Sequence, residues 1–310
     1  MLYNLRRMIT TTLYYLNKVK KQGGRIQMGT NIIIDSGAYS AKTQNIKIDI
    51  DEYIDWLEEN QDVCDKYFSL DVIGNGDKSY QNFLYMRMKG LDPIPVWHAE
   101  TDEKFLELYL EVCDYIAIGA ISVMSNERTS NSLDKVWKKY LTDDDYMPIV
   151  KVHGFGLTSL SMMTMYPWYS VDSTSWVQFG RYGVILIPHT RKMNTEWVYN
   201  ENPHIICVSA RSPQRSNQYK HISTFSEGNK KKFIEYIEHM GFKLGSSDVD
   251  DSGPKPKETI IEEGVSNNHL LRDEINMLYY LNVEKSMPPW PWRYTPKTHT
   301  ADIFNVEKAI

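Results

Sequence analysis

The sequence predicts an α/β fold of the (β/α)8 TIM-barrel type with a C-terminal helical extension, and three features of the chain lead to this prediction. Short runs of β-branched and aromatic residues recur along the chain, most of these runs are separated by segments with helical spacing, and several end in an aspartate or a histidine. Such alternation is typical of parallel sheets with crossover helices. A doubly wound open sheet is the alternative that the same pattern allows.

The predicted strands are short and are spread over the first two thirds of the chain. They lie at about residues 31–35, 67–71, 94–98, 115–118, 148–152, 169–172, 184–187 and 205–209. The segments between most of them carry apolar residues at helical spacing, as in residues 49–60 and 103–113. Eight strands with intervening helices match the plan of a (β/α)8 barrel.

The two ends of the chain differ from this plan. Residues 1–21 have leucines and an isoleucine at helical spacing, which predicts an amphipathic helix. Residues 245–268 are polar and poor in aromatic residues, which predicts a flexible linker or a disordered loop, and helical spacing resumes at residue 269 before a Pro/Trp-rich tail. We therefore expect a barrel domain over residues 1–244, a linker over 245–268, and a C-terminal helix and tail over 269–310.

The composition excludes several classes of protein. The 310 residues are 42% hydrophobic and 24% charged, which fits one large domain or a barrel with an appendage. The 3 cysteines are far apart and odd in number, which leaves neither a disulfide framework nor a C-x-x-C metal site and favours an intracellular compartment. We expect no bound metal, no cofactor and a cytoplasmic location. No apolar run approaches the ~20 residues of a membrane span, so we expect no membrane partner. The formal net charge of -5 means that any contact with nucleic acid must use a local basic surface.

Three of the predicted strands end in an aspartate, namely Asp35, Asp71 and Asp172. Because barrels carry their active sites at the carboxyl ends of the strands, we expect these side chains to share a pocket. Two carboxylates beside one glycosidic carbon can act as nucleophile and as general acid and base. The alternative for each aspartate is a cap on the following helix or turn.

Other polar and aromatic residues lie near the same strand ends. His98, Gly119 and His153 follow or end predicted strands, and Tyr39 offers a flat ring for stacking. A histidine at a strand end can equally be a hydrogen-bonded structural residue. Two histidines without a third clear ligand are weak support for a metal site.

Basic residues gather after the last two predicted strands, where barrels often bind phosphate. Those expected to contact a nucleic-acid backbone are Arg191, Lys192, Arg211 and Arg215. The arginine side chain suits phosphate oxygens because its donors form a fork. A solvated charged loop is the alternative.

Five short segments resemble, in order, the motifs of the tRNA-guanine transglycosylases, and especially of their DNA-acting relatives in phages and bacteria (DpdA-like proteins). The segments are residues 35–39 (Asp-Ser-Gly-Ala-Tyr), 69–71 (Ser-Leu-Asp), 116–120 (Ile-Ala-Ile-Gly-Ala), 152–156 (Val-His-Gly-Phe-Gly) and 171–173 (Val-Asp-Ser). Enzymes of this family are barrels that exchange guanine for another base. The resemblance covers approximately residues 31–209.

The resemblance implies a role for each matching residue. Asp172 stands at the place of the family's nucleophile, and Asp35 at that of its general acid and base. The residues that the resemblance assigns to base binding are Tyr39, Asp71, His98, Gly119, His153 and Gly154.

The chain also departs from the family. The tRNA enzymes hold a structural zinc ion through three Cys and one His, whereas only Cys207 lies in the second half of this chain. His98 stands near the place of a base-reading Gln, and Ala38 replaces a Gly. The missing zinc cluster and the short length favour the DNA-acting branch. The implied partners are DNA and a 7-deazaguanine base such as 7-cyano-7-deazaguanine, with tRNA as the alternative nucleic acid, and the implied location is the host cytoplasm if the protein is phage-encoded.

Two further classes of function stay open. With water in place of the second base, the same carboxylates would make an N-glycoside hydrolase. Without catalysis, the barrel would be a nucleic-acid-binding protein. The residues leave open which 7-deazaguanine is inserted and which oligomeric state the protein adopts, a homodimer included.

Overall fold

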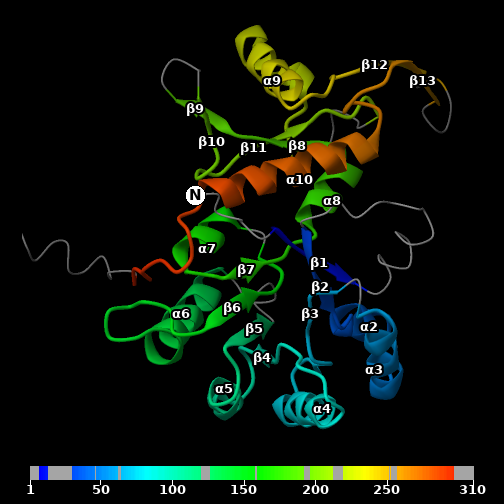
Figure 1. Cartoon of the computed structure of the whole chain (residues 1–310). Helices are drawn as coiled ribbons and strands as arrows, with labels where there is room; N and C mark the ends of the chain where they lie inside the picture. The colour runs from blue at the N-terminus through cyan, green and yellow to red at the C-terminus, as the bar shows by residue number, and fades with distance from the viewer. Residues whose placement is uncertain are drawn as a thin grey trace, which may run out of the picture. The chain divides into compact units, whose positions relative to one another are not determined.

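The computed structural model describes residues 7–12, 30–45, 47–61, 64–119, 126–157, 159–191, 196–211, 219–250, 252 and 257–296. The structure is a mixed α/β fold that divides into two compact units (Figure 1). The first unit is built from the described residues up to Leu157, from Met165–Asp172 and from those that start at Trp290. The second is built from the described residues of 158–164 and from Ser173–Pro289.

Parallel strands form the centre of the first unit. One sheet has the order β1 (Arg7–Thr12), β2 (Thr30–Asp35) and β3 (Lys66–Tyr67). The other has the order β4 (Val96–His98), β5 (Tyr115–Gly119), β6 (Lys151–Gly154) and β7 (Ser170–Val171). A parallel bridge between Phe68 and Ile94 joins the end of β3 to the segment that leads into β4. All residues of β5 are buried, as expected for a parallel strand that is covered on both faces.

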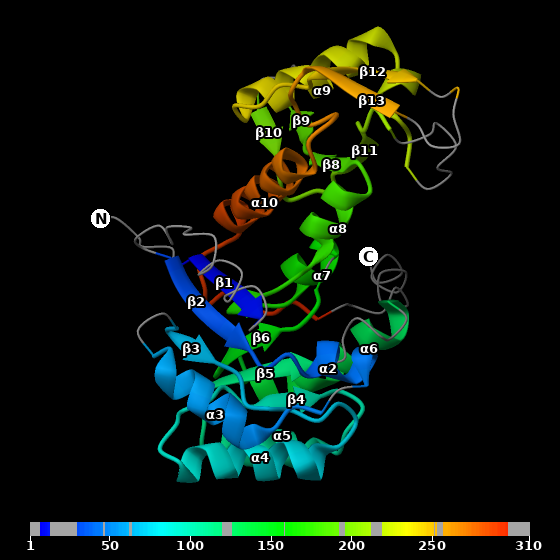
Figure 2. The same ribbon diagram turned by 90° about the vertical axis from the view of Figure 1, so that its right-hand side faces the viewer.

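Helices follow most of these strands in the chain. They are α2 (Ala38–Gln44), α3 (Ile50–Glu59), α4 (Gly76–Met88), α5 (Glu103–Leu110), α6 (Asn126–Val136) and the π-helical turn η2 (Trp137–Leu141). Figures 1 and 2 show α4 and α5 on the same side of β4 and β5. The inner face of α3 packs Ile54 and Leu57 against Ile34 and Leu70, so this helix covers the strand ends that carry the aspartates.

The second unit is built around antiparallel strand pairs. Its elements after α7 (Leu160–Met165) are α8 (Ser175–Arg181), β8 (Val184–Ile187), β9 (His189–Arg191), β10 (Glu196–Val198), β11 (His204–Cys207), η3 (Ile222–Thr224), α9 (Glu227–His239), β12 (Ser246–Asp250), β13 (Lys257–Glu262) and α10 (His269–Ser286). Asn276 joins α10 to the sheet, since its Oδ1 accepts from Leu186 N at 2.9 Å and its Nδ2 donates to Val184 O at 3.0 Å. The predicted helix from residue 269 is confirmed.

Two segments were predicted wrongly. Residues 7–12 form strand β1, which pairs in parallel with β2, and not a helix. Ile9 and the threonines at 10–12 are β-branched, and such residues favour strands when a partner strand is present. Residues 246–250 and 257–262 form an antiparallel hairpin, and not a flexible linker, because backbone pairing supplies order that polar composition does not reveal.

The last two predicted strands exist, but their pairing differs from the plan of successive parallel barrel strands. β8 and β11 are antiparallel partners, with Ile187 opposite His204 and Val184 opposite Cys207. Both strands are short apolar runs, and such runs do not reveal from sequence which direction the partner will take. The boundaries of the compact units accordingly differ from the predicted domain of residues 1–244.

The C-terminal segment returns to the first unit and packs there. Trp290 Nε1 donates to Pro167 O at 3.0 Å, and the hydroxyl of the buried Tyr294 donates to Asp134 Oδ1 at 2.8 Å. Within the described part of the chain, every helix is too short or too polar to cross a bilayer.

Candidate active site

The three predicted aspartates belong to the first unit and lie at strand ends. Asp35 is the last residue of β2, Asp71 comes shortly after β3, and Asp172 directly follows β7. The charges of Asp71 and Asp172 both act on Asp35, and Ser36 Oγ donates to Asp71 Oδ1 at 3.0 Å. The structure therefore brings these carboxylates together, as the sequence predicts.

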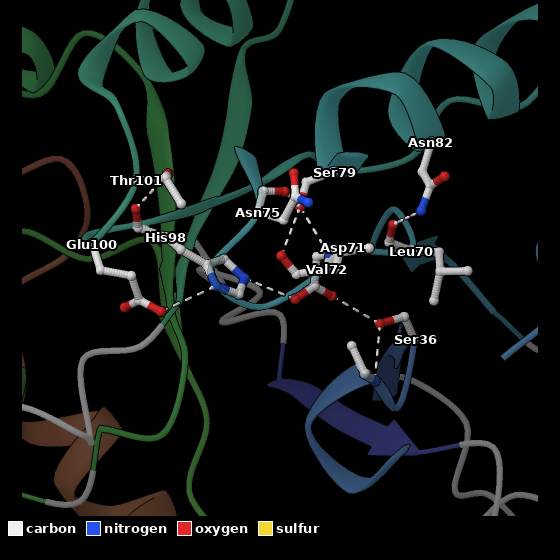
Figure 3. Close-up of polar contacts among 11 residues, drawn as sticks. Ser36, Leu70, Asp71, Val72, Asn75, Ser79, Asn82, His98, Glu100 and Thr101 are labelled. Atoms are coloured by element: carbon white, nitrogen blue, oxygen red, sulfur yellow. Dashed lines mark hydrogen bonds and ion pairs between the residues drawn. The ribbon is translucent and has the colours of Figure 1, made fainter. Parts of the chain in front are cut away.

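The carboxylate of Asp71 is held by the side chains of Ser36 and His98. Figure 3 shows its carboxylate between the Ser36 hydroxyl and the His98 ring, with His98 Nε2 at 2.8 Å from Asp71 Oδ2. The His98 and Asp71 side chains are only 4% and 9% exposed. On the other side of the ring, His98 Nδ1 lies 4.0 Å from Glu100 Oε1, beyond hydrogen-bond distance. A carboxylate held at both oxygens has a fixed orientation and still has lone pairs for a ligand.

Helix α4 fixes the chain on both sides of Asp71. Asn82 Nδ2 donates to Leu70 O at 2.8 Å, and Val72 N donates to Ser79 Oγ at 2.9 Å (Figure 3). Ser79 and Asn82 are buried polar residues three positions apart on the helix, so both face the loop. The backbone of Asp71 is thereby tied to a regular element.

Asp35 has an environment that favours its protonated form. Burial, and then the charges of Asp71 and Asp172, raise its pKa to about 7, while hydrogen bonds from the backbone N–H groups of Gly37 and Ser36 oppose this rise. Gly37 has a φ of 78°, in the region that suits glycine, and this turn places its N–H beside the carboxyl group. A carboxyl group with a pKa near 7 can donate and accept a proton at neutral pH.

Asp172 is partly exposed and is held by a backbone donor. Its side chain is 25% exposed, and its Oδ1 accepts from Gly156 N at 2.6 Å. Gly156 has a φ of 67°, so a residue with a side chain would be strained at this turn. The Gly156 N–H holds one carboxylate oxygen and leaves the other available for a ligand.

A buried set of polar groups lies behind Asp172. His153 is fully buried, and its Nε2 lies 3.6 Å from Asp172 Oδ1, which is near enough for an electrostatic contact but too far for a hydrogen bond. His153 Nδ1 and Tyr115 OH each lie 2.6 Å from Ser170 Oγ. Ser170 therefore fixes the His153 ring beside the carboxylate.

Gly119 and Gly154, which the sequence assigns to the site, leave space for neighbouring side chains because they lack a Cβ atom. A Cβ atom on Gly119 would lie 3.1 Å from His98 Cδ2, so the glycine leaves room for the ring that contacts Asp71. A Cβ atom on Gly154 would lie 2.5 Å from Leu157 Cδ1 and 3.1 Å from the Trp168 ring. Gly154 is thus needed for packing behind the strand end, whichever ligand binds in front of it.

The other predicted residues have different surroundings. Tyr39 is on α2 and is 63% exposed. Arg191 and Arg211 belong to the second unit, where they form ion pairs with Glu201 and Glu258. Arg191 is in strand β9 and not in a loop. Lys192 and Arg215 lie outside the described residues.

Sequence reasoning missed Ser36, Ser170, Tyr115 and Gly156. Ser170 and Asp172 are two positions apart at the end of a strand, and this spacing places side chains on one face, so the link was readable in principle. The contact of Tyr115 with Ser170 joins β5 to β7 and carries no local signal.

Within the described residues, no group of three or more His, Cys, Asp and Glu side chains is placed to hold a metal ion. A comparison of the chain with known proteins matches no family model and no curated sequence.

Proposed function

We propose that this protein is a base-exchange transglycosylase that replaces guanine in DNA with a 7-deazaguanine through a covalent aspartyl–glycosyl intermediate. The observation that carries the proposal is that Asp35, whose pKa is raised to about 7, lies near a second carboxylate, Asp172, whose side chain is 25% exposed. A carboxyl group that exchanges a proton at neutral pH suits the role of general acid and base, and a partly exposed carboxylate suits that of nucleophile. The choice of guanine and DNA comes from the resemblance of the five motifs.

In the first step, the free oxygen of Asp172 attacks C1′ of the deoxyribose. The bond between C1′ and the base nitrogen breaks, its electron pair leaves with guanine, and Asp35 supplies the proton that neutralises the base. The Gly156 N–H, at 2.6 Å from Asp172 Oδ1, keeps the attacking carboxylate oriented. The product is an ester between Asp172 and the sugar.

In the second step, the nitrogen of the incoming 7-deazaguanine attacks C1′ and displaces Asp172. The proton of that nitrogen passes to Asp35, which is then ready for the next cycle. Two displacements at one carbon retain the original configuration. The target nucleotide must leave the base stack to reach these residues.

Asp71 is proposed to bind the guanine edge. Its oxygens are held by Ser36 and His98, and its remaining lone pairs can accept the ring N–H and the amino group of the base. Two adjacent donors of a planar base match the two oxygens of a carboxylate. Tyr39, which is exposed, is proposed to stack on the base.

We also propose that strands β1 to β7 belong to a (β/α)8 barrel in which β1 is the first strand. The parallel order of the two sheets and the bridge between Phe68 and Ile94 support this arrangement. In such a barrel, Asp35, Asp71 and Asp172 all lie at the carboxyl ends of strands, where barrel enzymes carry their active sites.

The test is guanine exchange. Duplex DNA and tRNA that carry radiolabelled guanine are each incubated with 7-cyano-7-deazaguanine and the wild-type protein, Asp172→Asn or Asp55→Asn. Asp55 lies on an exposed position of α3, so its variant makes the same chemical change away from the carboxylates. We expect label loss from DNA that requires the added base, persists in Asp55→Asn and is abolished in Asp172→Asn.

The other outcomes each identify a different function. Loss of label from tRNA alone would make the protein a tRNA enzyme, and release of guanine without added base would make it a hydrolase. If no label is lost from either nucleic acid, or if Asp172→Asn is as active as the wild type, the proposed chemistry is wrong.

A further inference from the structure

The second unit contains a pocket of about 280 Å³ that the proposed base exchange does not use. Its walls come from strands β9, β10 and β11 and from helix α9. Ligand sites in proteins usually measure about 300–1,000 Å³, so this pocket has the size of a small molecule rather than of a polymer.

Three basic side chains line this pocket. The rings of His189 and His204 lie 4.1 Å apart between centroids, and Lys232 of α9 lines the same space. Burial, followed by the charges of His189 and Lys232, lowers the pKa of His204. The three groups thus repel one another when they are charged, and an anion between them would remove this repulsion.

The charges around these basic groups do not cancel them. Glu201 lies near enough to His189 to be affected by its charge, but this carboxylate is bound to Arg191. All the charged or titratable residues that line the pocket within the described part of the chain are basic. A cluster of like charges in a hollow is a candidate for a binding site.

Aromatic rings and an amide group also line the pocket. Phe225 and Phe233 line the pocket with their rings 5.1 Å apart at 86°, and Trp197 lines it from β10. Asn229, one helical turn before Phe233 on α9, adds an amide group. A flat ring can pack against such aromatic walls, while the amide group can bind its polar edge.

We propose that this pocket binds a small phosphate monoester that carries a flat ring, of which a nucleoside monophosphate is representative. The phosphate group, with nearly two negative charges at neutral pH, matches three basic side chains better than a single carboxylate does. The ring lies against the aromatic wall. This inference is independent of the proposed base exchange.

The test is calorimetric binding of dCMP to the full chain at low ionic strength. This probe contains no guanine, so failure of the proposed base exchange would not affect the measurement. Deoxycytidine and inorganic phosphate report the ring and the anion separately. We expect dCMP to bind at least about tenfold more tightly than either of them, because each supplies only part of the contacts.

Helix α9 offers a matched pair of variants. Lys232→Gln removes a basic group from the pocket. Lys231→Gln makes the same change at the preceding residue, which is exposed and whose Nζ lies 3.9 Å from Glu235 Oε1. We expect Lys232→Gln to weaken dCMP binding about tenfold and Lys231→Gln to change it by less than about twofold.

The protonation of His204 gives a second measurement. Burial and the charges of His189 and Lys232 lower the pKa of His204, and a bound phosphate would oppose this shift by favouring the imidazolium. Binding of dCMP should therefore take up a proton and strengthen as the pH falls from about 8 toward the ordinary histidine value of about 6.5. Absence of dCMP binding, or equal weakening by the two lysine variants, would overturn the site. Equal affinity for dCMP and inorganic phosphate would overturn the role of the ring.

Discussion

Burial and two neighbouring carboxylates raise the pKa of Asp35 to about 7, and this has a consequence for folding as well as for catalysis. In the unfolded chain, an aspartate titrates near its ordinary value of about 3.9. Between these two pH values the folded state binds more protons than the unfolded state. The free energy of unfolding therefore falls as the pH rises from about 4 to about 7, and this loss persists at higher pH.

The variant Asp35→Asn should no longer lose stability as the pH rises from about 4 to about 7. We expect the variant to be more stable than the wild type at about pH 8, by about 2–4 kcal/mol, with the difference shrinking toward about pH 4. Urea unfolding at several pH values measures this directly. If the proposed base exchange is correct, the same variant should lose it, since an amide cannot supply the proton; a gain of stability with a loss of activity is common for active-site residues. A variant that is less stable than the wild type at about pH 8 would contradict the raised pKa.

At the scale of the elements, helix α4 supports the site without belonging to it. Asn82 is buried and donates to Leu70 O at 2.8 Å, directly before Asp71. Asn82→Ala leaves that carbonyl without its donor, which should lower the free energy of unfolding by about 1–3 kcal/mol. Because Asp71 then moves more freely, KM in the proposed base exchange should rise more than kcat falls.

Gln81→Ala is the control for this prediction, since Gln81 is exposed on the preceding position of α4. We expect it to change the unfolding free energy by less than about 0.5 kcal/mol. Denaturant unfolding and steady-state kinetics provide the two readouts. If the two variants behave alike, the bond from Asn82 does not position Asp71.

Some strands of the fold could be predicted from the sequence, and others could not. The strand ends at Asp35, Asp71 and Asp172 were predictable, because apolar runs that end in a carboxylate are local patterns. Strand β1 was not, since its order depends on pairing with β2 across residues that are distant in sequence. The hairpin of β12 and β13 was missed because its composition is polar, while its order comes from backbone hydrogen bonds.

In the candidate site, too, some features follow from local sequence and others from contacts between residues that are distant in sequence. His98 was identified from its place at a strand end, but its bond to Asp71 joins residues 27 positions apart. The spacing of Ser170 to Asp172 is local and could have been used, but the contacts of Ser170 with His153 and Tyr115 exist only in the folded chain.

At the scale of the whole molecule, the C-terminal segment returns to the first unit after the chain has completed the second. Tyr294 is 1% exposed, and its ring stacks near Tyr166, with centroids 5.6 Å apart at 19°. Both tyrosine hydroxyls donate to Asp134 Oδ1. The segment thereby closes over a buried aromatic cluster next to strands β6 and β7.

Tyr294→Ala should loosen the first unit more than the second. The loss of a large buried ring destabilises a core by about 3–5 kcal/mol, and here it also removes a donor from Asp134. Hydrogen exchange measured by mass spectrometry should show faster exchange in β5 and β6 and unchanged exchange in β8 and α9. Arg293→Ala is the control, because the exposed Arg293 contacts only Asp145 at the surface in the described structure. Equally faster exchange in both units would mean that they unfold as one cooperative body, in which case the C-terminal segment stabilises the whole chain and not the first unit alone.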